Sequence, residues 1–559
     1  IESNQRRLGP LFSLNDEIGR WYNDSSFNLH DSGFWANNKS NIAIEARTIL
    51  EKSKNEQEVF DEYFDYDIWA KYFAIIDGLK LWHGSMPKSV KYFMNPTTGK
   101  IEPVFFDGHT NTTRILDNYN FYRLLDDPKT QDKFYCEYLC DDKYIFYKRF
   151  FGTYENPNRS FYEKYINHLT RLTSKDYQEE ILKPIWDNLS TERGRIYRDL
   201  WRIDRINQPG LMPYIAPWEA IKKSLNNTHD ELITSNKIEP EIIIDDINKK
   251  PIFLRNNLSK IPQIANLKCL TNNKKYTYVL PKGKLTRIDS TYNSECPIGE
   301  QVISINKFSN SYSNIKEAYL TFQRSSNTKE KIDDFNDEDL IFDKEYYEIK
   351  SPLIVNRKNI SILKNTKICL KEKGYIYFKN SIVKIMGSEE SPVIINNCDN
   401  DDQFSRGIII ENSNVSIQNL ELENLNSPKI NLRLLDGGLN FINSNIEINK
   451  LSSKDSIAED AINIINSKLN ANNINIYNTK SDAFDSDFSE FSIKKLNCKV
   501  IGNDCLDTSF SKGEIIEMDS KKTNDKAISI GEKSSIDIDN VSIFDSEIGI
   551  VSKDLSKLK

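Results

Sequence analysis

A repeat of 22 residues near the end of the chain limits the folds that this sequence can adopt. From residue 439 onward, small or apolar residues return at this spacing, and apolar and polar residues alternate inside each copy. The recurring columns are Leu439, Ala461, Ala483, Cys505, Ala527 and Gly549; Ile462, Phe484, Leu506, Ile528 and Ile550; and Ile464, Ser486, Thr508, Ile530 and Ser552. Such columns are typical of a coil that stacks on itself, with successive strands about 4.8 Å apart. The period therefore predicts a parallel β-helix. Its main rival, a leucine-rich repeat, needs an L-x-x-L-x-L-x-x-N pattern that is absent.

The coil is predicted to start near residue 345, well before the regular repeat. Short apolar runs follow one another at 353–355, 360–362, 368–370 and 383–387, in the rhythm of a first β-helix turn. This stretch resembles the opening turns of the right-handed β-helix superfamily. We therefore expect a right-handed parallel β-helix over residues 345–559.

Aspartates line the predicted coil in columns that are also 22 residues apart. They are Asp460, Asp482 and Asp504 in one column, Asp485 and Asp507 in a second, and Asp487 beside the second. The second column faces outward if Phe484 and Leu506 face inward. Stacked carboxylates repel, so they would share a proton, bind a cation such as Ca²⁺ or turn into water. Because Asp also favours turns for backbone reasons alone, a structural acidic ladder, a Ca²⁺ site and a glycan-cleaving or epimerising site all stay open.

The glycan interpretation comes from a resemblance to pectin-degrading β-helix enzymes. In those enzymes, acidic residues on neighbouring rungs act as acid and base or through Ca²⁺. Asn503-Asp504-Cys505 distantly resembles a motif of the polygalacturonases. The predicted coil has no histidine and few arginines, among them Arg406 and Arg433. The histidine and arginine of the polygalacturonase site therefore have no counterpart here.

Composition divides the rest of the chain. All seven tryptophans lie within the first 218 residues and all five histidines within the first 229. We predict a mainly helical α+β module over 1–230, a small β-rich connector over 231–344 and the β-helix over 345–559. Within the first module, apolar periodicity predicts helices over 61–81 and 160–200. Two apolar runs, 91–94 and 101–106, flank a turn at 95–99 and predict a hairpin.

The stretch from Phe73 to Gly108 resembles the CotH kinase family, whose members include spore-coat and secreted atypical kinases. A helix, the Trp82–Gly84 loop, a hairpin and the strand-end pair Asp107-Gly108 follow one another in the family's order. The resemblance covers roughly residues 1–230. It implies a kinase-like C-lobe that uses ATP and Mg²⁺, with the phosphate-binding lysine in an N-terminal lobe upstream of residue 1.

The resemblance also assigns candidate site residues. Phosphoryl transfer needs a carboxylate that holds Mg²⁺ and a group near the attacking hydroxyl. Asp107 matches the family's metal-binding aspartate, and Ser89 takes the place of an asparagine beside it. His83 stands where the family has an aspartate after the loop tryptophan, and Asp77 on the preceding helix is the alternative base. The second metal carboxylate is replaced by His109, a poor Mg²⁺ ligand. These departures leave both an active phosphotransferase and a pseudokinase open.

Charge and hydropathy exclude some function classes. The net charge of -7 argues against a general nucleic-acid binder, which needs a basic stripe. No apolar run approaches the roughly 20 residues that span a bilayer, and no signal peptide is visible. The eight cysteines form no CxxC pair, so we expect free buried thiols and no zinc site.

These observations together indicate a modular protein of the cell envelope or exterior. Its partner would be a polysaccharide or an envelope surface protein. Three functions stay open: a CotH-type phosphotransferase using Mg-ATP, a non-enzymatic adhesive or structural surface protein, and a polysaccharide lyase or epimerase that works on the β-helix with Ca²⁺.

Overall fold

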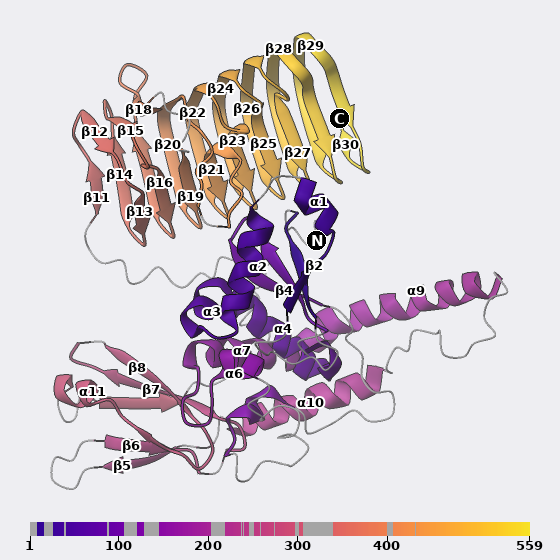
Figure 1. Ribbon diagram of the computed structural model, residues 1–559, viewed down its shortest axis with the longest axis vertical. Helices are drawn as coiled ribbons and strands as arrows, with labels where there is room; N and C mark the ends of the chain where they lie inside the picture. Colours follow the sequence, from indigo (N-terminus) through magenta and orange to yellow (C-terminus); the bar gives the residue numbers. More distant parts are fainter. Residues whose placement is uncertain are drawn as a thin grey trace. The chain divides into compact units, whose positions relative to one another are not determined.

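The computed structural model describes residues 8–15, 26–37, 41–85, 89–105, 120–127, 145–202, 218–235, 238, 240–244, 251–257, 259–272, 274–296, 301–305, 339–399, 406–430 and 432–559. The chain forms two compact units, one within Leu8–Lys316 and one within Glu317–Lys559 (Figure 1). The division between them falls inside the predicted connector. The boundaries at residues 230 and 344 stay predictions.

The first unit is built around the buried helix α4 (Tyr66–Leu79). The side chain of Asp65 caps this helix by accepting from the N–H groups of Asp67 and Ile68 at 3.0 and 3.1 Å. The prediction of one helix from residue 61 is therefore wrong at its start, because Asp65 is extended and ends the preceding helix, α3 (Gln57–Tyr63). The fully buried side chains of α4 include Trp69 and Phe73, so the core face is rotated from the one that periodicity indicated.

A small antiparallel sheet packs beside α4, in the order β2-β1-β3-β4. Its strands are β1 (Leu11–Asn15), β2 (Ser26–Leu29), β3 (Lys91–Asn95) and β4 (Lys100–Val104). The predicted hairpin is confirmed, since β3 and β4 pair in antiparallel register. The indole N–H of Trp69 donates to the carbonyl of Ile101 at 2.8 Å and ties the helix to the sheet.

Further helices surround this core. The predicted helical character of 160–200 is confirmed by α7 (Arg159–Thr173), which packs on α4, and by α8 (Lys175–Tyr177), a π-helical turn (Gln178–Leu182) and α9 (Lys183–Arg202). The others are α1 (Ser32–Asn37), α2 (Ile42–Ser53), α6 (Ile145–Phe151) and α10 (Trp218–Ser235), with 3₁₀ turns at Trp82–Ser85 and Phe121–Leu125.

Two three-stranded antiparallel sheets complete the first unit. One contains β5 (Glu241–Ile244), β6 (Pro251–Arg255) and β9 (Leu285–Arg287); the other contains β7 (Gln263–Cys269), β8 (Lys275–Leu280) and β10 (Gln301–Ile305). A short helix, α11 (Ser290–Glu295), follows β9. Leu254, Leu267 and Leu280 are buried between these elements.

The second unit is a parallel β-solenoid of about nine turns, residues 340–558, which confirms the predicted fold of this region. Its strands form three ladders (Figure 1). The first ladder contains β11 (Leu340–Phe342), β14 (Asn359–Leu363), β17 (Ile382–Met386), the beginnings of β20 (Asn414–Glu423), β22 (Asn445–Ser456), β24 (Lys468–Thr479), β26 (Glu490–Ile501), β28 (Lys512–Gly531) and β29 (Ser535–Ser552), and β30 (Lys557–Leu558). The second contains β12 (Tyr346–Ile349), β15 (Lys367–Leu370), β18 (Val393–Asn397) and the following parts of β20, β22, β24, β26, β28 and β29. The third contains β13 (Leu353–Asn356), β16 (Ile376–Lys379), β19 (Ile408–Glu411), β21 (Gly437–Ile442), β23 (Asp460–Ile465), β25 (Asp482–Asp487), β27 (Leu506–Ser509) and the ends of β28 and β29.

The register of the third ladder confirms most of the predicted columns. Ile462 pairs with Phe484, Phe484 with Leu506, and so on to Ile550. Leu439 is the exception, because it pairs with Ile462 and not with Ala461. That step is therefore 23 residues long, and the exact period of 22 holds only after it. Phe484 and Leu506 lie in the single apolar core that fills the solenoid.

A column of buried serines runs through the turns that join the third ladder to the first. The N–H of each serine donates to the Oγ of the serine one turn further on, at 2.9–3.1 Å. The members are Ser381, Ser413, Ser444, Ser467, Ser489, Ser511 and Ser534. The hydroxyl in turn donates to the carbonyl two residues before it, as at Ser467 and Ser489. This serine ladder satisfies a buried N–H at every turn.

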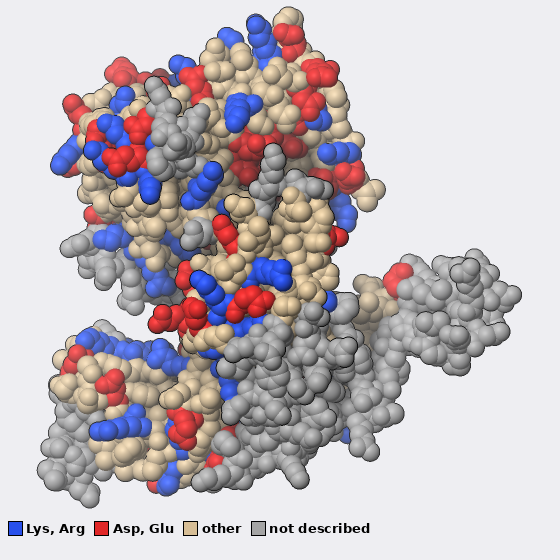
Figure 2. Space-filling view, in the orientation of Figure 1, with Lys and Arg blue, Asp and Glu red and all other residues tan. Residues whose placement is uncertain are grey.

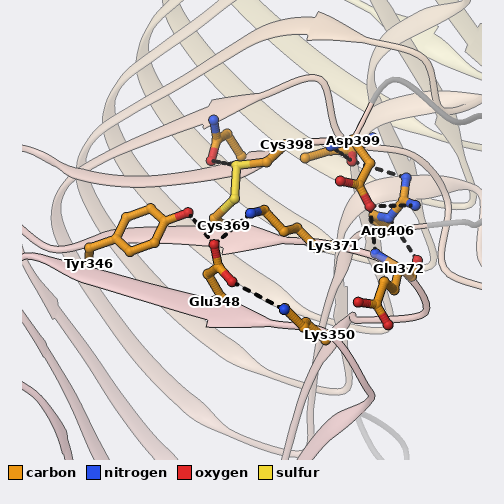
Figure 3. The surroundings of a disulfide bond; sticks show 11 residues. Tyr346, Glu348, Lys350, Cys369, Lys371, Glu372, Cys398, Asp399 and Arg406 are labelled. Atoms are coloured by element: carbon orange, nitrogen blue, oxygen red, sulfur yellow. Dashed lines mark hydrogen bonds and ion pairs between the residues drawn. A yellow bond between two sulfur atoms is a disulfide. The ribbon is translucent and has the colours of Figure 1, made fainter.

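The structure contains three disulfides, which corrects the expectation of free thiols. They are Cys269–Cys296, Cys369–Cys398 and Cys498–Cys505; Cys136 and Cys140 lie outside the described residues. Figure 3 shows Cys369–Cys398 on the second ladder, with Arg406 beside its end. Arg406 is buried and pairs with Asp399 at 3.1 Å. The disulfide and this ion pair both hold the segment after β18 to the coil.

Candidate functional site

Most residues that the CotH resemblance assigns are not placed by the structure. Asp107 and His109 lie outside the described residues, and the side chain of His83 is not described. Ser89 is buried directly before β3. These assignments stay predictions.

Asp77, the alternative base, lies deep inside the first unit. Its side chain is 1 % exposed. Its Oδ2 accepts from the hydroxyl of Tyr165 on α7 and from the N–H of Phe121 at 2.7 Å. Its Oδ1 has no hydrogen-bond partner among the described residues. Burial raises the pKa of the Asp77 carboxyl to about 7. The carboxyl thus links three elements and is closed to solvent.

The first predicted aspartate column on the solenoid binds backbone of the same coil. Asp482 Oδ1 accepts from the N–H of Asp504, one turn on, at 2.6 Å, and from Asn503 Nδ2 at 2.7 Å. Asp504 Oδ1 accepts from the N–H of Lys526 at 2.9 Å, and the ammonium of Lys526 lies 3.3 Å away. Burial raises the pKa of Asp482 to about 6. These two carboxylates therefore complete turns of the coil.

The second column lies on the outer side of the third ladder, as the alternation predicted. Asp485 and Asp507 pair in register, and Asp485 Oδ2 accepts from Asn463 Nδ2 at 2.9 Å. Burial and the nearby Asp504 raise the pKa of Asp507. Asp485 and Asp487 are only 9 % and 8 % exposed. Figure 2 shows acidic side chains gathered over β25 and β27. No group of three or more His, Cys, Asp or Glu side chains in the described parts of the chain is arranged to hold a metal ion.

An open hollow on the first ladder is the better candidate for a binding site. It has a volume of about 560 Å³ and lies at the outer side of four successive turns, where the first ladder meets the second. We call it the polar groove. Its polar lining is Ser416 and Gln418 from β20, Glu447 and Asn449 from β22, Asn470 and Asn472 from β24, and Ser492 and Lys494 from β26.

The groove continues along the coil axis. A second hollow of about 410 Å³ shares Asn470 and Ser492 with the first and reaches Glu514 on β28 and Asp537 on β29. Successive turns lie about 4.8 Å apart, so equivalent side chains recur at that step along the groove. The two hollows together cover six successive turns of the solenoid.

The groove's side chains are exposed and partly ordered by bonds between turns. Asn470 Nδ2 donates to Glu447 Oε1 at 2.8 Å, and Asn472 Nδ2 donates to Asn449 Oδ1 at 3.0 Å. An amide has two N–H donors and a carbonyl acceptor. Within the described residues, each of these two asparagines therefore keeps donor and acceptor capacity for a ligand. Most lining groups are amides and hydroxyls, which both donate and accept, as the hydroxyls of sugars do.

The sequence analysis missed this groove. Its residues recur as polar positions two apart, such as Glu447 and Asn449 or Asn470 and Asn472. Amides are common in the turns of any coil, so only the register shows that these residues share one hollow.

Comparison of the sequence with protein-family models, curated proteins and solved structures finds no match. Among the described residues, no helix is long and apolar enough to cross a membrane. The site's geometry therefore carries the functional argument alone.

Proposed function

We propose that the solenoid is a glycan-binding module and that the protein works as a modular binding protein outside the cytosol. The polar groove is the observation that carries this proposal. Amides and hydroxyls at a repeat of about 4.8 Å match the alternating donors and acceptors of a polysaccharide. That repeat is also close to the length of one pyranose residue in an extended glycan chain. A polymer lying along the coil axis would meet equivalent groups at every turn.

The three disulfides support the proposed compartment. Disulfides persist in oxidising surroundings and are rare in the cytosol. Cys369–Cys398 joins neighbouring turns on the outside of the solenoid, and Cys498–Cys505 lies in its core. A location in the cell envelope or exterior is consistent with both.

Binding is better supported than cleavage. Asp482 and Asp504 are bonded to the N–H groups of the next turn, a role that needs no substrate. Lyase or epimerase activity, with or without Ca²⁺, stays a prediction. Phosphotransferase activity of the first unit, with Mg-ATP, likewise stays a prediction from the CotH resemblance.

Replacing both Asn470 and Asn472 by alanine should weaken glycan binding about tenfold. Each lost amide removes hydrogen bonds worth about 0.5–1.5 kcal/mol, and tenfold corresponds to about 1.4 kcal/mol. Affinity electrophoresis of the full chain against a panel of soluble glycans measures this: a β-1,3-glucan, a β-1,4-glucan, a mannan, a soluble chitin derivative and polygalacturonate.

Asn475 and Asn497 supply a matched control. They form the same kind of amide contact between turns, at 2.7 Å, but on the second ladder, away from the polar groove. Their double alanine variant should bind as the wild type does. If no glycan in the panel retards the wild type, or both double variants lose retardation equally, the groove is not the binding site.

A further inference from the structure

The two small sheets of the first unit carry a charge opposite to that of the whole chain. Residues 251–296 contain eight basic and two acidic side chains, whereas the full chain has a net charge of -7. The basic residues are Arg255, Lys260, Lys268, Lys274, Lys275, Lys282, Lys284 and Arg287. Figure 2 shows lysine and arginine side chains gathered over β7 and β8. This part of the molecule is therefore suited to an anionic ligand.

A pocket of about 550 Å³ opens beside this sheet. Its lining includes Arg159 at the start of α7, Tyr276, Thr277 and Tyr278 from β8, Arg287 at the end of β9, and Asp289. All of these residues belong to the first unit. Two arginines and two tyrosines thus converge on one hollow from separate elements.

The two guanidinium groups are available for a ligand. Arg159 Nη1 donates to the carbonyl of Thr277 at 2.9 Å, which holds its side chain at the pocket. Within the described residues, neither Arg159 nor Arg287 forms an ion pair, whereas Arg255 and Lys274 are paired with Glu241 and Glu295. The planar guanidinium fork recognises carboxylate, phosphate and sulfate by two parallel hydrogen bonds.

Tyr278 adds a further donor. Its phenol oxygen accepts from the N–H of Asp289 at 3.0 Å, so its own O–H proton is left to donate. Asp289 is the one carboxylate among the lining residues, and its Oδ1 accepts from the N–H of Thr291 at 2.8 Å. That bond satisfies part of the carboxylate's charge at the start of α11.

We infer that this pocket binds the oxyanion group of an acidic ligand between Arg159 and Arg287. The guanidinium groups supply charge-assisted bonds, and Tyr278 supplies a neutral donor. The shared chemistry is that of a phosphate, a sulfate or a carboxylate. The site is separate from the polar groove, and its test does not depend on glycan binding by the solenoid.

Isothermal titration of the full chain with sodium phosphate, sodium sulfate and sodium glucuronate tests the inference, with ionic strength held constant by sodium chloride. We expect saturable binding of at least one anion. Arg287→Gln should weaken it about tenfold or more, since a charge-assisted bond contributes roughly 1.5–3 kcal/mol. Arg287→Lys, which keeps the charge but loses the fork, should weaken it less.

Lys268→Gln is the matched control. It removes one positive charge from β7, outside the pocket lining, and should leave binding unchanged. Binding of one anion and not the others supports the inference and identifies the ligand's acidic group. Equal weakening by Lys268→Gln and Arg287→Gln, or no saturable binding of any of the three anions, overturns it.

Discussion

Replacing Ser467 and Ser489 by alanine should lower the free energy of unfolding of the solenoid by about 2–6 kcal/mol. Ser467 Oγ accepts from the N–H of Ser444 at 3.0 Å, and Ser489 Oγ accepts from the N–H of Ser467 at 2.9 Å. Alanine removes both acceptors and leaves two buried N–H groups unpaired. A buried donor without a partner costs about 1–3 kcal/mol.

Hydrogen exchange followed by mass spectrometry on peptides covering residues 440–470 measures this effect locally. Tryptophan fluorescence does not report on the solenoid, because all seven tryptophans lie in the first 218 residues. The peptides should exchange faster in the double variant. A control double variant, Ser492→Ala with Ser542→Ala, alters two exposed serines and should leave exchange unchanged. Equal exchange in all three proteins would show that the serine ladder does not stabilise the coil.

The serine ladder also shows what the sequence contained and the analysis did not use. In four of its turns the serine follows an asparagine with positive φ, namely Asn380, Asn412, Asn443 and Asn466. Asparagine tolerates the left-handed region better than most residues. The Asn-Ser pair therefore marks each turn even where the spacing changes. It would have shown that Leu439 is one residue out of step with the later copies.

Apolar alternation predicted the solenoid well because one physical requirement decides it. Side chains of a strand alternate between two faces, so Phe484 and Leu506 had to fill the core and Asp485 and Asp507 had to lie opposite. The same argument failed on α4, where a capping carboxylate at Asp65 begins the helix later than its apolar residues do. A single hydrogen-bonded cap outweighed the periodicity of Phe64.

Contacts between turns could not be predicted from spacing alone. Cys369 and Cys398 are 29 residues apart, and this distance indicates a disulfide only once the register of β15 and β18 is known. The polar groove depends on the register in the same way. Charge, by contrast, was visible in the sequence, since the basic residues of 251–296 are contiguous.

The second large effect concerns the buried carboxyl of Asp77 and the pH dependence of the first unit's stability. Its pKa is about 7 in the folded protein and 3.8 in the unfolded chain. Between these values the folded state holds a proton that the unfolded state releases, so stability falls as pH rises. The loss begins near pH 4 and is complete above pH 7. It amounts to about 4 kcal/mol, since each pKa unit corresponds to about 1.4 kcal/mol.

Asp77→Asn should remove this dependence, because the amide is neutral at every pH and its oxygen still accepts from Tyr165 and Phe121. Urea unfolding followed by tryptophan fluorescence from pH 4 to pH 8 reports on the first unit alone. The variant should gain about 4 kcal/mol relative to the wild type across that range. Tyr165→Phe should keep the pH dependence, since the carboxyl stays buried. A constant difference between Asp77→Asn and wild type would mean that the folded protein holds Asp77 ionised throughout. In that case its charge would be balanced inside the fold, and a role as a proton-accepting base would again be open.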